Sequence, residues 1–285
     1  MQLQLEIDIG LASFPWCGKR IAIAEAPHRR RIEGRRAHRG RGPRDRPVTQ
    51  ISPGSQELPA AGRRDEDRTG AAFELPARYA GRAAAAQLAI KRCVDVAGAA
   101  VGLMLLSPIL GLIALAVLLD SGAPVFYRWK VVGLRGRPFT GYKFRTMVPE
   151  ADERRSQLEG MNEMTGPVFK MRDDPRVTRV GRFLRRFSLD ELPQLWSVLK
   201  GDMSLVGPRP PLQHEWSRFE PWQRRKLSVK PGMTCLWQVS GRSDIKDFTE
   251  WVKLDIEYIE RWSLLLDVQI LFATGVAVIR SRGAY

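Results

Sequence analysis

Two adjacent carboxylates, Asp190 and Glu191, follow a run of arginines and precede a turn rich in glycine and proline. A carboxylate set among fixed cations can attack a phosphate ester or carry a metal ion, while the cations hold the phosphate charge. The pattern therefore predicts chemistry on a phosphorylated substrate. A structural interpretation is compatible with it, because Ser188 and Glu191 have the spacing of a helix capping box.

Basic residues near this pair are candidates for holding phosphate. Arg185 ends an arginine-rich stretch, and Arg209 stands between prolines in the sequence 207–211. Each proline locks φ and restricts the residue before it, so Arg209 suits bidentate phosphate binding, with a plain structural turn as the alternative. Lys143 and Arg145 alternate with aromatic residues, which puts both cations on one face of a predicted strand, either at the site or at a solvated edge.

An apolar run over 96–119 is long enough to span a bilayer core of about 30 Å. Ser107 and Pro108 lie at its centre, and a proline there removes a helix hydrogen bond and favours a break. Basic residues flank both ends, and the positive-inside tendency then favours both ends in the cytoplasm. The pattern predicts a re-entrant segment at about 94–119, in which Ser107 bonds the carbonyls that Pro108 frees. A kinked spanning helix is the alternative.

The elements that must position these residues are short. Residues 124–144 are predicted to form a β-hairpin that turns between Gly133 and Gly136. Periodicity predicts a polar helix over 149–165 and amphipathic helices over 176–186 and 248–258. The mostly apolar residues 263–280 fit an interfacial or packing helix. Tryptophans among arginines and lysines in the last third are typical of a protein at the lipid headgroup level, with core aromatics as the alternative.

The 285-residue chain has a formal net charge of +15, which calls for nucleic acid, anionic lipid or a phosphorylated substrate as partner. With three histidines, a His-rich metal site or a Ser-His-Asp arrangement is not expected, and the three widely spaced cysteines show no metal-ligand spacing. Residues 1–81 are rich in arginine and proline and are predicted to be disordered, as a basic arm or a solvated linker. Residues 82–285 are predicted to form the membrane-associated catalytic domain.

Several motifs, in this order, resemble those of the bacterial sugar transferases, which are monotopic phosphoglycosyl transferases that act on polyprenyl phosphate. They are Lys91-Arg92 with Asp95; Ser107-Pro108; the segment 142–147; the segment 188–195; the segment 200–210; the segment 229–234; and the segment 237–242. The similarity covers roughly residues 91–285. Many relatives carry Gln and Arg where this chain has Trp129 and Val131.

The resemblance implies an α+β, mostly helical, membrane-associated monotopic domain with a re-entrant helix hairpin, a small β-hairpin and amphipathic interfacial helices. It implies transfer of a sugar 1-phosphate from a UDP-sugar to undecaprenyl phosphate, with release of UMP, to initiate exopolysaccharide or other glycoconjugate synthesis. The expected place is the cytoplasmic face of the bacterial inner membrane, in contact with anionic lipid. No nucleic-acid partner is expected, and a homo-oligomer is left open.

The resemblance also implies residue roles. Asp190 would attack the sugar-linked phosphate, form an aspartyl-phosphosugar intermediate and ligate Mg²⁺, while Glu191 acts as base or orienter. The phosphate-binding residues would be Arg185, Arg209, Lys143 and Arg145. Two alternatives follow from the residues: a membrane-anchored, non-catalytic basic binding protein, and a glycosyltransferase that moves the sugar alone and releases UDP.

Overall fold

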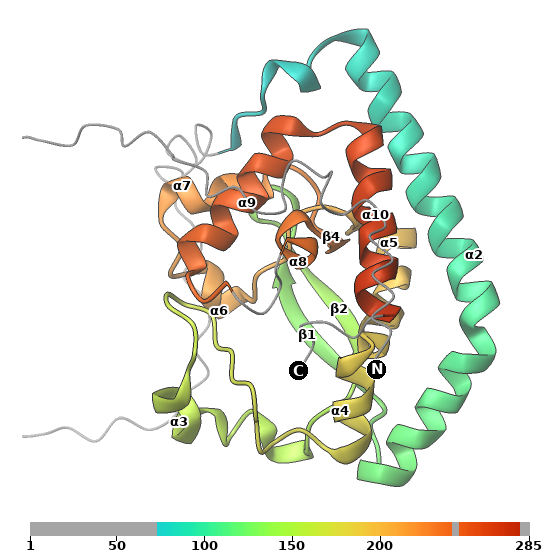
Figure 1. The fold of residues 1–285 in the computed structure, drawn as a ribbon, viewed down its shortest axis with the longest axis vertical. Coiled ribbons are helices and arrows are strands. Elements are labelled where there is room, and N and C mark those ends of the chain that lie inside the picture. The colour runs from blue at the N-terminus through green and yellow to red at the C-terminus, as the bar shows by residue number, and fades with distance from the viewer. Residues whose placement is uncertain (1–72, 241–244, 280–285) are drawn as a thin grey trace, which may run out of the picture. The chain divides into compact units, whose positions relative to one another are not determined.

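The computed structural model describes residues 73–240 and 245–279. Helices predominate there, together with two small two-stranded sheets, which confirms the predicted α+β, mostly helical class. Figure 1 shows the elements, with the long helix α2, Gly81–Ser121, along one side of the others.

Residues 1–72 of the predicted disordered segment lie outside the described residues, but residues 73–81 do not. Ala77–Tyr79 form a short 3-10 helix, Phe73 stacks on Trp216, and Tyr79 stacks on Trp262 with ring centroids 5.2 Å apart. The prediction of disorder is therefore wrong for residues 73–81. Their two aromatic rings find partners more than a hundred residues later, which local composition does not indicate.

Helix α2 is continuous through Pro108 and is bowed in Figure 1, so the two predicted half-helices are one bent helix. Ser107 Oγ donates a hydrogen bond of 2.8 Å to Met104 O, as predicted. Within the described ranges α2 alone has the length and composition needed to cross a membrane. The re-entrant path of this segment stays a prediction.

Both halves of α2 pack against the rest of the described chain. Ala99 in the first half is fully buried in a cluster with Leu195 and Val198. Ile113 and Val117 in the second half join a cluster with Phe144 and Leu184. One face of α2 is therefore covered along its length, while apolar side chains on the other face stay exposed, among them Leu105, Leu112 and Leu119.

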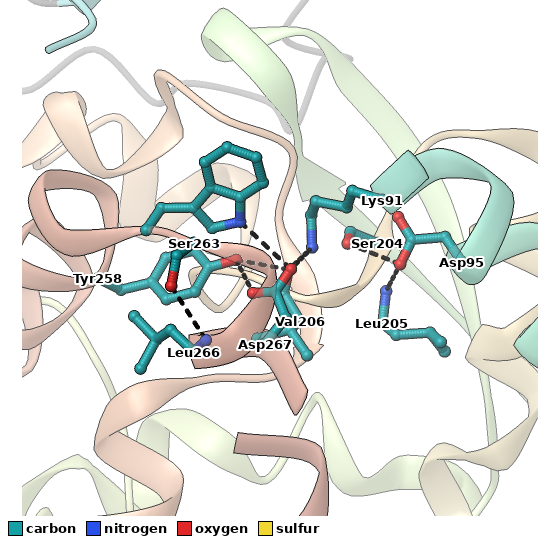
Figure 2. A network of polar contacts seen from close by, with 10 residues as sticks. Lys91, Asp95, Ser204, Leu205, Val206, Tyr258, Ser263, Leu266 and Asp267 are labelled. Carbon is teal, nitrogen blue, oxygen red and sulfur yellow. Dashed lines mark hydrogen bonds and ion pairs between the residues drawn. The ribbon is translucent and has the colours of Figure 1, made fainter. Parts of the chain in front are cut away.

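The motif Lys91-Arg92 with Asp95 fixes the first half of α2, and Figure 2 shows the contacts of Lys91 and Asp95. Lys91 Nζ donates to Asp267 Oδ2 at 2.6 Å and to Val206 O at 3.0 Å. Asp267 also accepts bonds from Tyr258 and Trp262. This buried network joins α2 to strand β3, Ser204–Val206, and to helix α10, Leu264–Ile279.

Two further residues of that motif make equivalent contacts. Asp95 Oδ1 accepts from Ser204 Oγ at 3.0 Å and from Leu205 N at 2.9 Å, as Figure 2 shows. Arg92 donates to Val198 O and Leu199 O, carbonyls in the last turn of helix α5, Leu195–Lys200. A cation at a helix C-terminus satisfies carbonyls that the helix leaves without donors. The motif therefore fixes α2 to the elements that flank residues 200–210.

The predicted β-hairpin is confirmed. Strands β1, Phe126–Val132, and β2, Pro138–Phe144, pair antiparallel, and a short 3-10 turn, Leu134–Gly136, joins them. Strand β3 pairs in parallel with β4, Gly232–Thr234.

The remaining helices are mostly short. They are α3, Arg155–Leu158; α4, Arg179–Arg186; α6, Gln213–Trp216; α7, Pro221–Arg224; α8, Leu236–Val239; and α9, Phe248–Arg261, with further 3-10 helices at Pro149–Ala151, Glu159–Met161, Leu189–Gln194 and Arg225–Leu227. Helices α4, α9 and α10 confirm the predictions for 176–186, 248–258 and 263–280.

The predicted polar helix over 149–165 is wrong, since α3 and two 3-10 turns are the only helical pieces there. The Asn162 side chain bonds the backbone of Met164, Val168 and Lys170. Such side-chain bonds offer the backbone an alternative to helical pairing.

Candidate active site

A cavity of about 390 Å³ brings together all six residues predicted to bind or react. Its lining includes the pair Asp190 and Glu191, together with the predicted phosphate-binding residues Lys143, Arg145, Arg185 and Arg209. They come from the 3-10 helix Leu189–Gln194, the end of β2, the end of α4 and the loop after β3. The tertiary structure thus gathers residues that are up to 66 positions apart in sequence.

The carboxylate pair lies on a tight turn, not on a capped α-helix. Ser188 has φ of 54° and makes no capping hydrogen bond with its side chain, and Leu189–Gln194 is a 3-10 helix. The predicted capping box is therefore absent, because the left-handed backbone at Ser188 and the tighter helix place its hydroxyl differently. Pro193 and Gln194 are buried and fix the turn to its surroundings.

Opposing influences act on the pKa of Asp190. Burial raises the pKa of Asp190 above its ordinary value, and the neighbouring Glu191 raises it further. Lys143 and Arg185 act in the opposite direction and favour the carboxylate. A metal cation, or a phosphate held by Lys143 and Arg185, would therefore change the pKa of Asp190 directly.

Lys143 binds Glu191, with Nζ 2.8 Å from Oε1 and both side chains largely buried. Lys143 and Arg145 line the cavity, whereas Phe144 between them packs into the core with Leu184. The predicted separation of cationic and aromatic faces in this strand is confirmed at these residues.

Arg185 lies close to both carboxylates. Its Nε donates to Thr146 Oγ1 at 2.9 Å, which orients the guanidinium. Burial lowers the pKa of Arg185, while Asp190 opposes that shift. The side chain stays cationic because an arginine pKa starts so high.

Arg145 has a structural contact that the sequence pattern did not indicate. Its Nη2 donates to Ser121 O at 2.7 Å, to Ser121 Oγ at 3.0 Å and to Gly122 O, at the C-terminal end of α2. Within the described residues its Nε and Nη1 are buried without a hydrogen-bond partner. Arg145 therefore ties the end of the long apolar helix to the cavity wall.

Arg209 lies over Trp251, with its guanidinium carbon 5.8 Å from the ring centroid. Trp251 stacks on Trp237 at 4.1 Å. Below this loop Lys226 Nζ lies 2.6 Å from Asp255 Oδ2, and both side chains are almost fully buried. The loop of Arg209, predicted to be rigid from its prolines, thus packs on stacked tryptophans and lies next to a buried ion pair.

Sequence reasoning missed several cavity residues. Trp129, Lys170, Trp237, Gln238 and Trp251 line the cavity. The tryptophans 237, 251 and 262 are buried, so the headgroup interpretation is wrong for them and they are core aromatics. Their composition alone cannot distinguish these places. Trp222 is exposed, in keeping with the headgroup interpretation.

The described residues contain no cluster of three or more His, Cys, Asp or Glu side chains that would by itself hold a metal. Mg²⁺ commonly uses one or two carboxylates and takes its remaining ligands from substrate phosphates and water. The donor set fits that pattern, because Asp190 and Glu191 line the cavity side by side and their proximity disfavours two uncompensated charges.

Comparison with known proteins agrees with the motifs. The sequence model described as "Bacterial sugar transferase" matches residues 86–281. The chain is 44% identical over 200 residues to the "Undecaprenyl-phosphate galactose phosphotransferase" of Salmonella typhimurium, covering 69% of this chain and 42% of that one. It is 45% identical over 204 residues to the "UDP-galactose-lipid carrier transferase" of Erwinia amylovora, covering 69% and 42%.

A third relative is matched over most of its length. The "Exopolysaccharide production protein ExoY" of Rhizobium meliloti is 42% identical over 199 residues, covering 68% of this chain and 88% of that protein. The match spans less than half the length of the Salmonella and Erwinia proteins. The family model covers more than half of this chain, including the carboxylate pair and the cavity. The chain belongs to the bacterial sugar transferase family.

Proposed function

We propose that this protein transfers a sugar 1-phosphate from a UDP-sugar to undecaprenyl phosphate, and so initiates exopolysaccharide or another glycoconjugate. The observation that carries the proposal is the placement of Asp190 beside Glu191, Lys143 and Arg185 in one cavity. Relatives named as undecaprenyl-phosphate and UDP-galactose-lipid carrier transferases support the substrate classes.

The proposed reaction has two displacements. An oxygen of Asp190 attacks the sugar-linked phosphorus of the donor, the diphosphate bond to UMP breaks, and an aspartyl-phosphosugar remains. An oxygen of undecaprenyl phosphate then attacks the same phosphorus, Asp190 leaves as a carboxylate, and undecaprenyl diphosphate sugar is formed. One cavity can therefore serve a soluble donor and a lipid acceptor in turn.

The surrounding residues have distinct parts in this scheme. Arg185 and Arg209 hold phosphate charge, and Lys143 orients Glu191 while adding positive potential at Asp190. Glu191 acts as base or orienter. Asp190 would hold Mg²⁺, which would supply further neutralisation of the diphosphate. Arg145 lines the cavity and holds its wall to the end of α2.

The membrane arrangement is part of the proposal. Both halves of α2 pack on the same folded unit, and its other face is apolar and exposed. A helix that dips into one leaflet and returns satisfies both facts, whereas a fully spanning helix would carry one packed half away from that unit. We place the catalytic unit on the cytoplasmic face of the inner membrane, in contact with anionic lipid.

The test is UMP release from a panel of UDP-sugars by the purified full-length protein with Mg²⁺ and undecaprenyl phosphate. The wild type is expected to release UMP from one donor, and Asp190→Asn to lose at least about a thousandfold of that rate, in the range seen when a covalent nucleophile is removed. Asp173→Asn is the matched control, because Asp173 is exposed and does not line the cavity.

A second arm omits the acceptor and uses a donor that is radiolabelled in its sugar-linked phosphate. The wild type is expected to release UMP stoichiometrically with enzyme and to keep the label on the protein, whereas Asp190→Asn does neither. Wild-type turnover by Asp190→Asn would refute the nucleophile. Release of UDP would instead identify simple glycosyl transfer.

A further inference from the structure

Lys143 links Trp129 to Glu191 of the carboxylate pair. The Lys143 ammonium is 4.1 Å from the centroid of the Trp129 ring and 2.8 Å from Glu191 Oε1. An ammonium over the face of an indole is attracted by the ring quadrupole, and the attraction strengthens when water is excluded. Trp129 is only 5% exposed. Lys143 is therefore held between a negative ring face and a carboxylate.

The β-hairpin explains how this contact arises. Trp129 pairs with Gly141 across the strands, and Lys143 pairs with Tyr127, so Trp129 and Lys143 are diagonal neighbours on one face. Diagonal neighbours in a sheet lie about 7–8 Å apart at the backbone and meet only through large side chains. The indole covers the distance by lying over Gly141.

Gly141 makes room for the ring. A Cβ built at Gly141 would lie 2.1 Å from Trp129 Nε1 and 2.8 Å from Cδ1. Trp129 Nε1 is buried and has no hydrogen-bond partner among the described residues. Packing over Gly141 and the contact with Lys143, rather than a hydrogen bond of the indole, thus fix the ring.

We propose that Trp129 is a positioning residue that holds the Lys143 ammonium against Glu191. A lysine side chain loses rotamer entropy when it is fixed, and attraction to the ring face offsets part of that cost. Arg185 from α4 and Asp190 also act electrostatically on Glu191. The proposal rests on the proposed function.

A series of tryptophan analogues with increasing fluorination, introduced at position 129 by nonsense suppression, tests the proposal. Each added fluorine weakens the negative electrostatic potential of the ring face while the shape of the ring stays nearly constant. We expect kcat to fall stepwise, by roughly two- to tenfold across the series, with KM for the donor nearly unchanged. Trp129→Phe should lie between the wild type and Trp129→Leu. A constant kcat across the series, or a loss confined to KM, would overturn the proposal.

The same series in a Lys143→Met background identifies the intermediary. If Trp129 acts through Lys143, the dependence on fluorination disappears there; a dependence that persists contradicts the proposal. Gly141→Ala should reproduce the kcat loss by displacing the ring. Gly160→Ala is its control, because nothing lies within 4 Å of a Cβ at that position.

These outcomes are separate from those of the proposed function. If the wild type releases no UMP, or if Asp190→Asn matches it, the proposed function fails. If the wild type is active and Asp190→Asn is not, a flat fluorination series overturns the role of Trp129 alone.

Discussion

Ser107 Oγ donates a hydrogen bond of 2.8 Å to Met104 O, the carbonyl that Pro108 leaves without its main-chain donor. The hydroxyl thus gives this exposed carbonyl a hydrogen-bond donor in place of the missing N–H. The pair Ser107 and Pro108 therefore lets α2 bend without interruption, so that both halves remain packed on the same unit.

Replacing Pro108 by alanine should straighten α2 and favour a spanning orientation, because alanine restores the hydrogen bond and removes the ring that bends the helix. In a Cys17→Ser background, a membrane-impermeant maleimide should leave exposed Cys93 unlabelled in spheroplasts of the parent and label it in Pro108→Ala. Gly111→Ala is the control, since its Cβ would meet nothing within 4 Å. Equal protection in all three proteins would contradict the bend as the cause.

Asp267→Asn should lower the free energy of unfolding by about 3 kcal/mol, because it leaves the largely buried Lys91 ammonium without its carboxylate partner. Asp202→Asn removes an ion pair of the same 2.6 Å length that is partly exposed, and should cost less than about 1 kcal/mol. Denaturant unfolding in detergent measures both. Equal losses would mean that burial of the Lys91 pair does not govern its contribution.

The ion pair of Asp174 and Arg176 predicts an acid-sensitive contribution to stability. Burial alone would raise the pKa of Asp174, but hydrogen bonds and charge from Arg176 outweigh it, so the pKa is lowered. A lowered carboxyl pKa stabilises the fold above the unfolded value of about 3.9, and the contribution is lost as the pH falls through the folded value.

Asp174→Asn should therefore be less stable than the wild type from about pH 7 to pH 5, and the difference should shrink below about pH 4. Thermal unfolding across that range gives the comparison. A gap that stays constant down to pH 3 would show that the charge of Asp174 is not its source.

Removal of divalent cations tests the proposed role of Asp190 as a Mg²⁺ ligand. Excess EDTA should reduce UMP release to background, and added Mg²⁺ should restore it, because the carboxylate pair and the donor diphosphate then repel each other without neutralisation. Ca²⁺ of equal concentration is a useful control, since its larger radius and flexible coordination position phosphates poorly. Full turnover in EDTA would exclude an essential divalent ion.

Local sequence signals determined much of this protein. The apolar periodicity of residues 176–186 and 248–258 and the glycine turn after β1 specified α4, α9 and the hairpin, because these depend on neighbours a few positions away. The residue types of Asp190 and Glu191, set among cations, predict phosphate chemistry from the sequence alone. The hydrogen bond of Ser107 was also predictable, since its partner lies one turn away.

Tertiary structure decided what depends on distant partners. Ser188 adopts a left-handed backbone conformation instead of the predicted capping box, and Arg145 binds Ser121 at the end of α2. Trp237 and Trp251 became core residues rather than headgroup contacts. The contact between Trp129 and Lys143 exists only because the strand register places Gly141 beneath the indole. Side-chain types state which interactions are available, but only the packed chain selects which of them are made.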